Sequence, residues 1–178
     1  MVCFDELGPL ELRPYHGCGW FRKGRPRRLR ATCKRVAGVE QLLAFYDVYS
    51  DCLVGQVRKQ KTHKDLLAVF ARLRACYPRR QRIYLVIDNL NTHRHPLVRE
   101  FYASNNIEPV WTPTYASWLN AIEAHFGSIR RFAINGSDDP SHQHRRRRIR
   151  RYLTWRNIQH GATSCPLTNF RRIKLDRH

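Results

Sequence analysis

The sequence predicts a single α/β domain in which a mixed β-sheet carries helices on its faces. Three observations lead to this prediction. The first third of the chain holds segments rich in strand-forming residues, the rest alternates helical and strand patterns, and 178 residues suffice for one domain with a substantial core. Strands grouped early and alternation later imply a sheet with both parallel and antiparallel neighbours.

The early segments favour a strand, a loop and a hairpin. VCFDEL, residues 2–7, is expected to be a short strand that ends at the Gly8-Pro9 pair, because these residues favour a turn. HGCGWFRKGRPRR, residues 16–28, is basic and rich in turn formers, which predicts an exposed loop. Residues 38–60 hold two β-forming runs interrupted at the letters YSD, a pattern typical of a hairpin.

The segment THKDLLAVFARLRACYP, residues 62–78, predicts an amphipathic helix. Thr62 is a suitable N-cap and Pro78 stops the helix. Its apolar face would consist of Leu66, Leu67, Phe70 and Leu73, which recur at three- to four-residue spacing.

A strand, a helix, a second strand and a further helix are expected next. RIYLVID, residues 82–88, is an apolar run suited to a central strand, whereas HPLVREFYASNN, residues 95–106, favours a helix with Pro96 in its first turn. IEPVW, residues 107–111, fits a short strand. Residues 112–133 begin as a loop and become a helix, whose inner face would use Leu119, Ile122, Phe126 and Ile129.

The charge of the chain points to a polyanionic partner. The 33 Lys and Arg residues against 14 Asp and Glu give a net charge of +19 and a pI near 10.6, which is typical of nucleic-acid-binding domains. Six arginines lie within seven positions and are candidates for phosphate contacts; the alternative is the usual explanation of such a run, a solvated helix face or a frayed tail. They are Arg145, Arg146, Arg147, Arg148, Arg150 and Arg151.

The cysteines and the N-terminus suggest a reducing compartment. The six cysteines lie at least 15 residues apart, so no pair has zinc-site or redox-site spacing, and reduced thiols are expected. The N-terminus lacks a signal-peptide pattern, and the apolar runs fall far short of the ~20 residues that span a bilayer. We therefore expect a cytoplasmic, nucleoid-associated protein without membrane contact.

Three acids occupy positions where a fold could bring them together: Asp5, Asp88 and Glu123. Asp88 follows a buried strand, where an unpaired carboxylate would be costly, so it needs a cation or several donors. The alternative is that Asp88 caps the following loop with the help of Asn89 and Thr92. Glu123 could be an exposed helix residue, but Asn120 one turn earlier indicates an inward orientation.

These acids carry a family resemblance. CFDELGPL, VIDNLNTHR and PTYASWLNAIEAHFGSIRRF, with 34 residues between Asp88 and Glu123, resemble the DDE catalytic domain of the IS630 and Tc1/mariner superfamily of transposases. RPRRLRAT and YLTWRN resemble the IS630 branch. The resemblance implies an RNase H-like fold, a catalytic domain over residues 1–157 and a basic C-terminal tail over residues 158–178.

The resemblance also implies chemistry. Asp5, Asp88 and Glu123 would bind Mg²⁺ or Mn²⁺, since carboxylates are the hard oxygen ligands these ions prefer, and two ions would catalyse phosphoryl transfer. The implied substrates are the transposon ends in DNA and a TA-type target. Asn89, His93 and Asn120 would support the acids from outside the ligand set.

Other polar and aromatic residues have competing roles. Glu6 should point to the opposite face of the strand from Asp5, as a surface or supporting residue. Asp47 and Asp51 flank the hairpin turn, and turn chemistry accounts for both. A further set brackets the loop before Glu123: Trp111 as a packing residue, and Tyr115 or Trp118 as surfaces for an unpaired base.

Full-length transposases of this kind carry helix-turn-helix modules before the first acid, and here Asp5 is the fifth residue. We expect such modules on a partner chain, or a truncated gene, and synapsis would require a homodimer. Two alternatives to a DNA endonuclease and strand transferase remain open: a non-catalytic DNA-binding remnant, and an RNase H-like nuclease acting on another nucleic acid.

Overall fold

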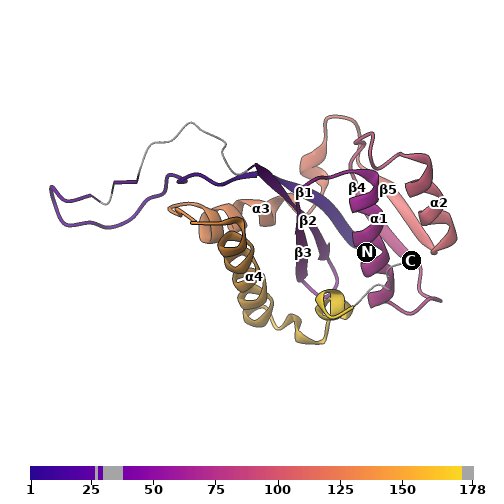
Figure 1. Ribbon diagram of the computed structural model, residues 1–178. Coiled ribbons are helices and arrows are strands. Elements are labelled where there is room, and N and C mark those ends of the chain that lie inside the picture. Colours follow the sequence, from indigo (N-terminus) through magenta and orange to yellow (C-terminus); the bar gives the residue numbers. More distant parts are fainter. Residues whose placement is uncertain (27, 30–37, 174–178) are drawn as a thin grey trace.

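A five-stranded mixed sheet with strand order β3-β2-β1-β4-β5 forms the centre of the computed structural model, which describes residues 1–26, 28–29 and 38–173 (Figure 1). The strands are β1 (Val2–Glu11), β2 (Val39–Asp47), β3 (Cys52–Arg58), β4 (Ile83–Ile87) and β5 (Ile107–Trp111). The first three pair antiparallel, whereas β4 runs parallel to both β1 and β5. The predicted mixed sheet is therefore confirmed.

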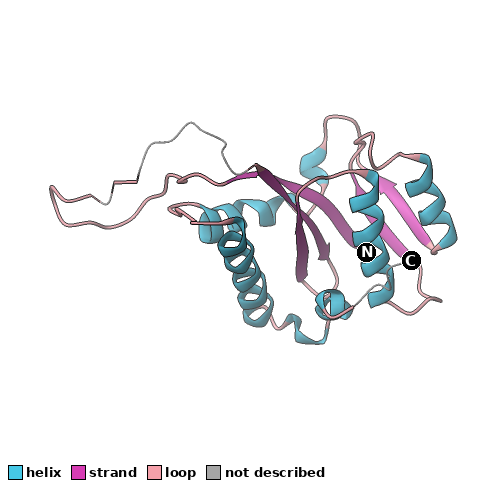
Figure 2. Cartoon of the chain, in the orientation of Figure 1, coloured by secondary structure: helices cyan, strands magenta, loops and turns pink. Residues whose placement is uncertain are grey.

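Helices cover both faces of the sheet (Figure 2). They are α1 (His63–Cys76) and α2 (Pro96–Ser104) on one face, and α3 (Glu123–Ile129) and α4 (His142–Gln159) on the other. Side chains of β1 point alternately to the two faces of the sheet. Phe4 packs in the apolar cluster under α1 and α2, whereas Cys3 and Leu7 pack in the cluster under α3 and α4. Because both faces are buried, the strands are nearly continuous in apolar residues.

Several local predictions are confirmed. The side chain of Thr62 accepts a hydrogen bond from the backbone of Asp65 at the start of α1, and the reciprocal bond completes a capping box. Pro96 lies in the first turn of α2, and Asn105 is the C-cap of this helix. Pro109 lies in β5, an edge strand, where a missing backbone donor is tolerated.

Two predictions about element boundaries are wrong. The first strand does not end at Gly8-Pro9 but continues to Glu11, with the register shifted between Leu7 and Leu10, because an irregularity in the ladder accommodates the turn-forming pair. Leu119 does not face inward: it is 60% exposed, because it belongs to a 3₁₀ turn, η1 (Ser117–Leu119), and the α-helix begins only at Glu123. Ile122, Phe126 and Ile129 do form the inner face, as predicted.

The helix that begins at Glu123 changes from an α-helix to a π-helix along its length. α3 continues without a break into the π-helical segment η2 (Arg130–Ile134), which buries Ala133 and Ile134. A short connection then leads into α4, where the side chain of Ser141 accepts a hydrogen bond from the first turn of the helix.

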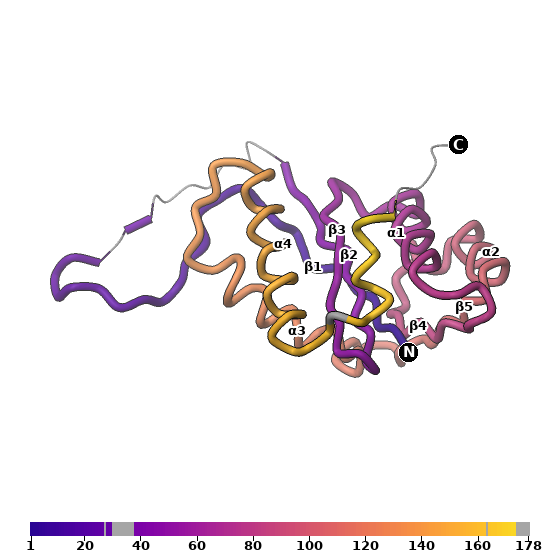
Figure 3. The backbone as a smooth tube through the Cα atoms, turned by 90° about the horizontal axis from the view of Figure 1, so that it is seen from below, coloured from indigo at the N-terminus to yellow at the C-terminus, as the bar shows by residue number. Residues whose placement is uncertain are grey.

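The chain after α4 passes around the β3 edge to the α1 side of the sheet (Figure 3). Its turns η3 (Ala162–Ser164) and η4 (Pro166–Arg171) bury Leu167 and Phe170 in the α1 cluster. The described part of the predicted basic tail, residues 158–178, therefore includes core residues, while residues 174–178 lie outside the described chain. That residues 1–157 form the catalytic unit stays a prediction.

The predicted exposed loop is present in residues 16–26, which extend away from the sheet and expose Trp20 fully (Figure 1). Arg27 of this loop lies outside the described residues, as do Cys33 and residues 30–32 of the RPRRLRAT motif. Within the described ranges, no helix is both long enough and apolar enough to span a bilayer.

Candidate active site

The three predicted acids come from three neighbouring elements. Asp5 lies in β1, Asp88 directly follows β4, and Glu123 is the first residue of α3. β1 and β4 are parallel neighbours in which Cys3 pairs with Val86, so the same register carried two residues further sets Asp88 level with Asp5. Ile122, next to Glu123, packs in the cluster that also contains Cys3, so the start of α3 lies over β1.

The electrostatics of Asp5 tie the three acids together. Burial, with only 8% of the residue exposed, raises the pKa of Asp5, and the negative charges of Glu123, Asp88 and Glu6 raise it further, to about 7. A hydrogen bond of 2.6 Å from the backbone N–H of Glu6 to Asp5 Oδ1 offsets part of this increase. The fold thus places Asp5 within the electrostatic field of both other predicted acids.

A buried histidine holds Asp88. His93 Nδ1 lies 2.7 Å from Asp88 Oδ1, and its Nε2 lies 2.8 Å from Glu6 Oε1. Burial lowers the pKa of His93, but the hydrogen bonds to Asp88 and Glu6 outweigh it and raise the pKa to about 9. The hydrogen bond from His93 in turn lowers the pKa of Asp88. An imidazolium therefore bridges the two carboxylates at neutral pH.

Glu6 is a buried partner rather than a surface residue. Its side chain is only 5% exposed and also lies 3.4 Å from Lys61 Nζ. It lies on the opposite face of β1 from Asp5, as alternation predicts, and acts on Asp88 through His93. Sequence inspection singled out His93 but not this pairing, because 87 residues separate the two partners.

The two asparagines anchor the backbone around the acids. Asn120 is buried; its side-chain Nδ2 donates to the Phe4 carbonyl of β1 at 2.8 Å, and its backbone carbonyl accepts from the Glu123 N–H at 3.0 Å. Asn89 donates to the Thr112 carbonyl and so joins the loop after β4 to the end of β5. Asn120 links the strand of Asp5 to the helix of Glu123, which fixes the relative positions of these two acids.

The donor set fits a hard divalent cation by its chemistry. The three carboxylates come from β1, the end of β4 and the start of α3. Burial is the main cause of the raised pKa of Asp5, the negative charges of the other two acids add to it, and a bound cation would offset such repulsion. The side chains are not arranged as a closed ligand set, however. Across the described ranges no three His, Cys, Asp or Glu residues stand close enough to hold an ion together.

The predicted phosphate-binding arginines divide into two groups. Arg145 is fully buried: its Nε lies 3.1 Å from Asp139 Oδ2 and it donates to the Glu11 carbonyl, so it is a core residue and not a phosphate contact. Arg146 pairs with Glu40. The exposed arginines of the run are Arg147, Arg148, Arg150 and Arg151.

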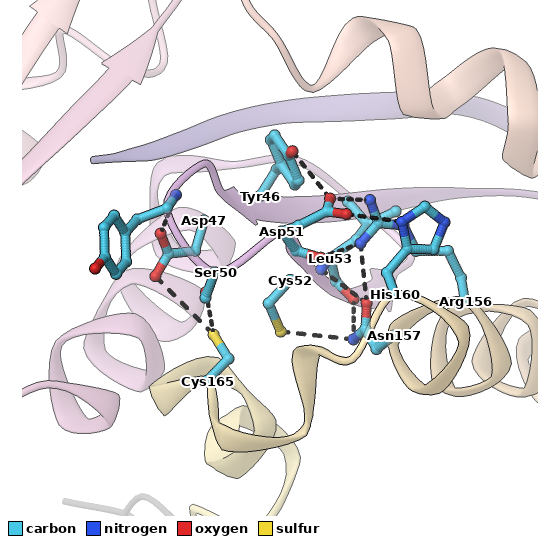
Figure 4. A network of polar contacts seen from close by, with 11 residues as sticks. Tyr46, Asp47, Ser50, Asp51, Cys52, Leu53, Arg156, Asn157, His160 and Cys165 are labelled. Carbon is cyan, nitrogen blue, oxygen red and sulfur yellow. Dashed lines mark hydrogen bonds and ion pairs between the residues drawn. The ribbon is translucent and has the colours of Figure 1, made fainter.

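The two aspartates at the hairpin turn, Asp47 and Asp51, make more contacts than the turn chemistry predicted for them. Asp51 does occupy the turn, with φ of 49°, but it also accepts hydrogen bonds from Arg156 and from Tyr46, and His160 Nδ1 lies 2.7 Å away (Figure 4). Asp47 is likewise buried and accepts from the hydroxyl of Tyr77 at 2.8 Å. These contacts fasten the turn to the end of α4 and to α1.

The aromatic residues before Glu123 differ in exposure. Trp111 is partly buried against the α1 cluster, with the Arg94 guanidinium 4.9 Å from its ring centre, which agrees with the expected packing role. Tyr115 and Trp118 are 93% and 73% exposed. Both rings are thus available to solvent on the loop that leads to Glu123.

Fold and site together define an RNase H-like domain with an acidic centre at the junction of β1, β4 and α3. Residues 1–143 match the family described as DDE superfamily endonuclease, and the chain belongs to this family. A comparison with curated proteins finds no match.

Solved structures share the fold at low sequence identity. The Mos1 mariner paired-end complex with Mn matches with a TM-score of 0.68 at 15% identity, over 96% of this chain and 53% of the Mos1 chain. The Mos1 strand transfer complex matches with a TM-score of 0.67 at 15% identity, over 96% and 52%. The catalytic core domain of BIV integrase matches at 0.54 and 13% identity, over 86% and 80%. The chain therefore spans about half the length of the Mos1 chains.

Proposed function

We propose that this chain is the catalytic domain of a transposase that cleaves DNA at transposon ends and transfers the freed strand to a target. The observation that carries the proposal is the placement of the three acids: the β1–β4 register sets Asp88 level with Asp5, and α3 begins over β1 with Glu123, so that both charges act on buried Asp5. Membership of the DDE endonuclease family supports the reaction class. Phosphoryl transfer by such a site needs no protein nucleophile.

In this proposal Asp5, Asp88 and Glu123 hold Mg²⁺ or Mn²⁺, as two ions. When bound, such ions activate the attacking oxygen and stabilise the leaving oxygen of the phosphodiester. The rest of the chain positions the acids: His93 orients Asp88, and Asn120 holds the start of α3 against β1. These contacts keep the carboxylates in place before a substrate arrives.

DNA is the proposed partner. The net charge of +19 and the exposed arginines of α4 supply the electrostatic attraction. Mos1 structures that include a transposon end or Mn share the fold, which favours the same substrate class for this chain. A TA-type target, a helix-turn-helix partner chain, a homodimer and assignment to the IS630 branch belong to the same proposal.

Plasmid nicking tests the activity. Purified protein is incubated with supercoiled plasmid and Mn²⁺, and the initial nicking rate is compared among wild type, Asp88→Asn and Glu123→Gln. The matched control is Glu100→Gln, which removes an exposed carboxylate on α2. We expect a loss of at least about 100-fold for the two site variants, because each removes an ionic ligand, and no change for the control. Equal nicking by wild type and Asp88→Asn would remove the proposal.

A non-catalytic DNA-binding protein is the second candidate. It is favoured by the exposed arginines of α4 and by the lack, in the described chain, of a closed three-residue ligand set. This function predicts salt-sensitive DNA binding that persists in EDTA and in Asp88→Asn, with no nicking by the wild type under either metal.

A further inference from the structure

A groove lies between η2 and the outward side of α4, with a volume of about 730 Å³. It is distinct from the acidic centre, since none of the three acids lines it. Its lining includes three aromatic residues and three arginines: Phe132, Tyr152, Trp155, Arg147, Arg148 and Arg151. We call it the α4 groove.

The aromatic rings of the α4 groove form a row. The rings of Phe132 and Tyr152 are stacked with centres 5.9 Å apart and an interplanar angle of 15°, and the ring of Trp155 follows 6.0 Å beyond Tyr152. Phe132 is 62% exposed and Trp155 is 54% exposed. The two ends of the row thus offer exposed aromatic surface. At the Phe132 end, the Arg131 guanidinium lies 5.5 Å from the ring centre and adds a further cation beside the ring.

The charge around these rings is positive. Arg147 and Arg151, one helical turn apart, are exposed on the side of α4 that lines the groove. The acid that lines the groove, Asp139, is buried and already paired with Arg145 and with Arg148 at 2.8 Å. The net field at the groove therefore attracts an anion.

We propose that the α4 groove binds an unpaired segment of a nucleic acid strand, with bases stacked on Phe132 and Trp155 and phosphates contacting Arg147 and Arg151. Rings that accept a base of any sequence beside arginines that follow the backbone are the two requirements of single-strand binding. A duplex would contact the arginines but would leave the rings unused, because its bases are stacked on each other.

The position of the α4 groove extends the proposed function and rests on it. Phe132 lies nine residues beyond Glu123 on the continuous α3–η2 segment, which corresponds to roughly 13 Å along a helix. A DNA strand that enters the acidic centre can thus reach the groove within a few nucleotides. The groove would hold the strand that is unpaired beside the cut.

Binding in EDTA separates this proposal from catalysis. Fluorescence anisotropy measures the affinity of wild type for a labelled 12-nucleotide single strand, for an abasic strand of equal length and for a duplex. The abasic strand keeps the phosphates and removes the stacking partners. We expect the normal strand to bind roughly 5- to 100-fold more tightly than the abasic strand, which is the range that base stacking contributes.

Two variants and two matched controls locate the effect. Trp155→Ala should lose most of the preference for the normal strand, and Arg151→Ala should weaken both single strands together. Arg150→Ala removes the same charge from the other side of α4, outside the groove, and Trp20→Ala removes an exposed ring from the extended loop. Both controls should keep the preference between normal and abasic strands. Circular dichroism confirms that each variant is folded, and Phe132→Ala replaces Trp155→Ala if the latter unfolds.

Equal affinity for normal and abasic strands, or a preference for duplex, would overturn the proposal. So would a Trp155→Ala variant that behaves as the wild type. Because the measurement excludes metal and can be repeated in Asp88→Asn, a chain without nicking activity can still confirm the groove, and an active chain can still contradict it.

Discussion

The acidic centre and the α4 region differ in the neighbours of their buried charges. Along α4, buried arginines face acids: Arg145 lies 3.1 Å from Asp139, and Arg156 pairs with Asp51. At the centre, Asp5 is surrounded by further carboxylates, with no cation at hydrogen-bond distance among the contacts of the described residues. Lys61 and His93 bind Glu6 on the other face of the strand, and His93 also binds Asp88, but neither binds Asp5.

This difference separates charges that stabilise the fold from charges that work against it. In a buried ion pair, the attraction between the two charges offsets the cost of removing both from water. Removing one partner therefore leaves the other charge buried and unpaired, which is costly. Like charges brought together raise the free energy of the folded state, and such arrangements concentrate at functional sites. Breaking a pair should therefore destabilise the protein, whereas neutralising Asp5 should stabilise it.

The largest effect is expected at Arg145. Arg145→Ala should lower the free energy of unfolding by about 3–5 kcal/mol, because Asp139 and the Glu11 carbonyl lose a buried donor. Urea denaturation measures the change. Arg147→Ala, which removes an exposed arginine from the same run, should change stability by less than about 0.5 kcal/mol. Similar losses in both variants would contradict the division of the arginine run.

His93 should make stability depend on pH at the basic end. Its pKa in the folded protein, about 9, exceeds its ordinary value of 6.5, so its contribution is complete below pH 6.5 and is lost as the pH rises through 9. We expect the wild type to lose about 3 kcal/mol more than His93→Gln between pH 6 and pH 10. Parallel stability curves for the two proteins would show that His93 is not the bridging cation.

Asp5, in contrast, should lower the stability of the folded protein as the pH rises. Its pKa is raised from 3.8 to about 7, so the folded protein is penalised progressively above pH 4 and fully above pH 7. Without metal at pH 8, Asp5→Asn should therefore be more stable than the wild type by up to about 4 kcal/mol, and the gain should vanish at pH 4. Thermal unfolding in EDTA at both pH values measures it. A destabilised Asp5→Asn at pH 8 would mean that Asp5 has a favourable partner.

The smallest effect is expected for an exposed ion pair. Arg82 and Glu108 lie 3.2 Å apart with both side chains more than half exposed. Arg82→Ala should lower stability by less than about 1 kcal/mol, and high salt should remove the difference, because water screens the pair. Urea curves with and without 1 M NaCl test this, and a salt-independent loss would assign Arg82 a packing role.

Much of the fold could be predicted because its signals are local. The capping box at Thr62, Pro96 in the first turn of α2 and the apolar run of β4 each depend on residues a few positions apart. The two wrong boundaries arise where tertiary contacts override such signals. β1 continues through Gly8-Pro9 because its remaining residues still pair with β2, and Leu119 turns outward because the helix starts later than its periodicity suggests.

The order of the elements, the excess of positive charge and the three acids at family spacing are all properties of the amino-acid sequence. Which charges have partners depends instead on how the chain packs in three dimensions. Arg145 and Arg147 are alike in sequence, yet one is buried on Asp139 and the other faces solvent. Glu6 and His93 likewise meet across 87 residues. The reason is physical: the energy of a charge depends on burial and on neighbours within a few ångströms, and packing between distant segments sets both.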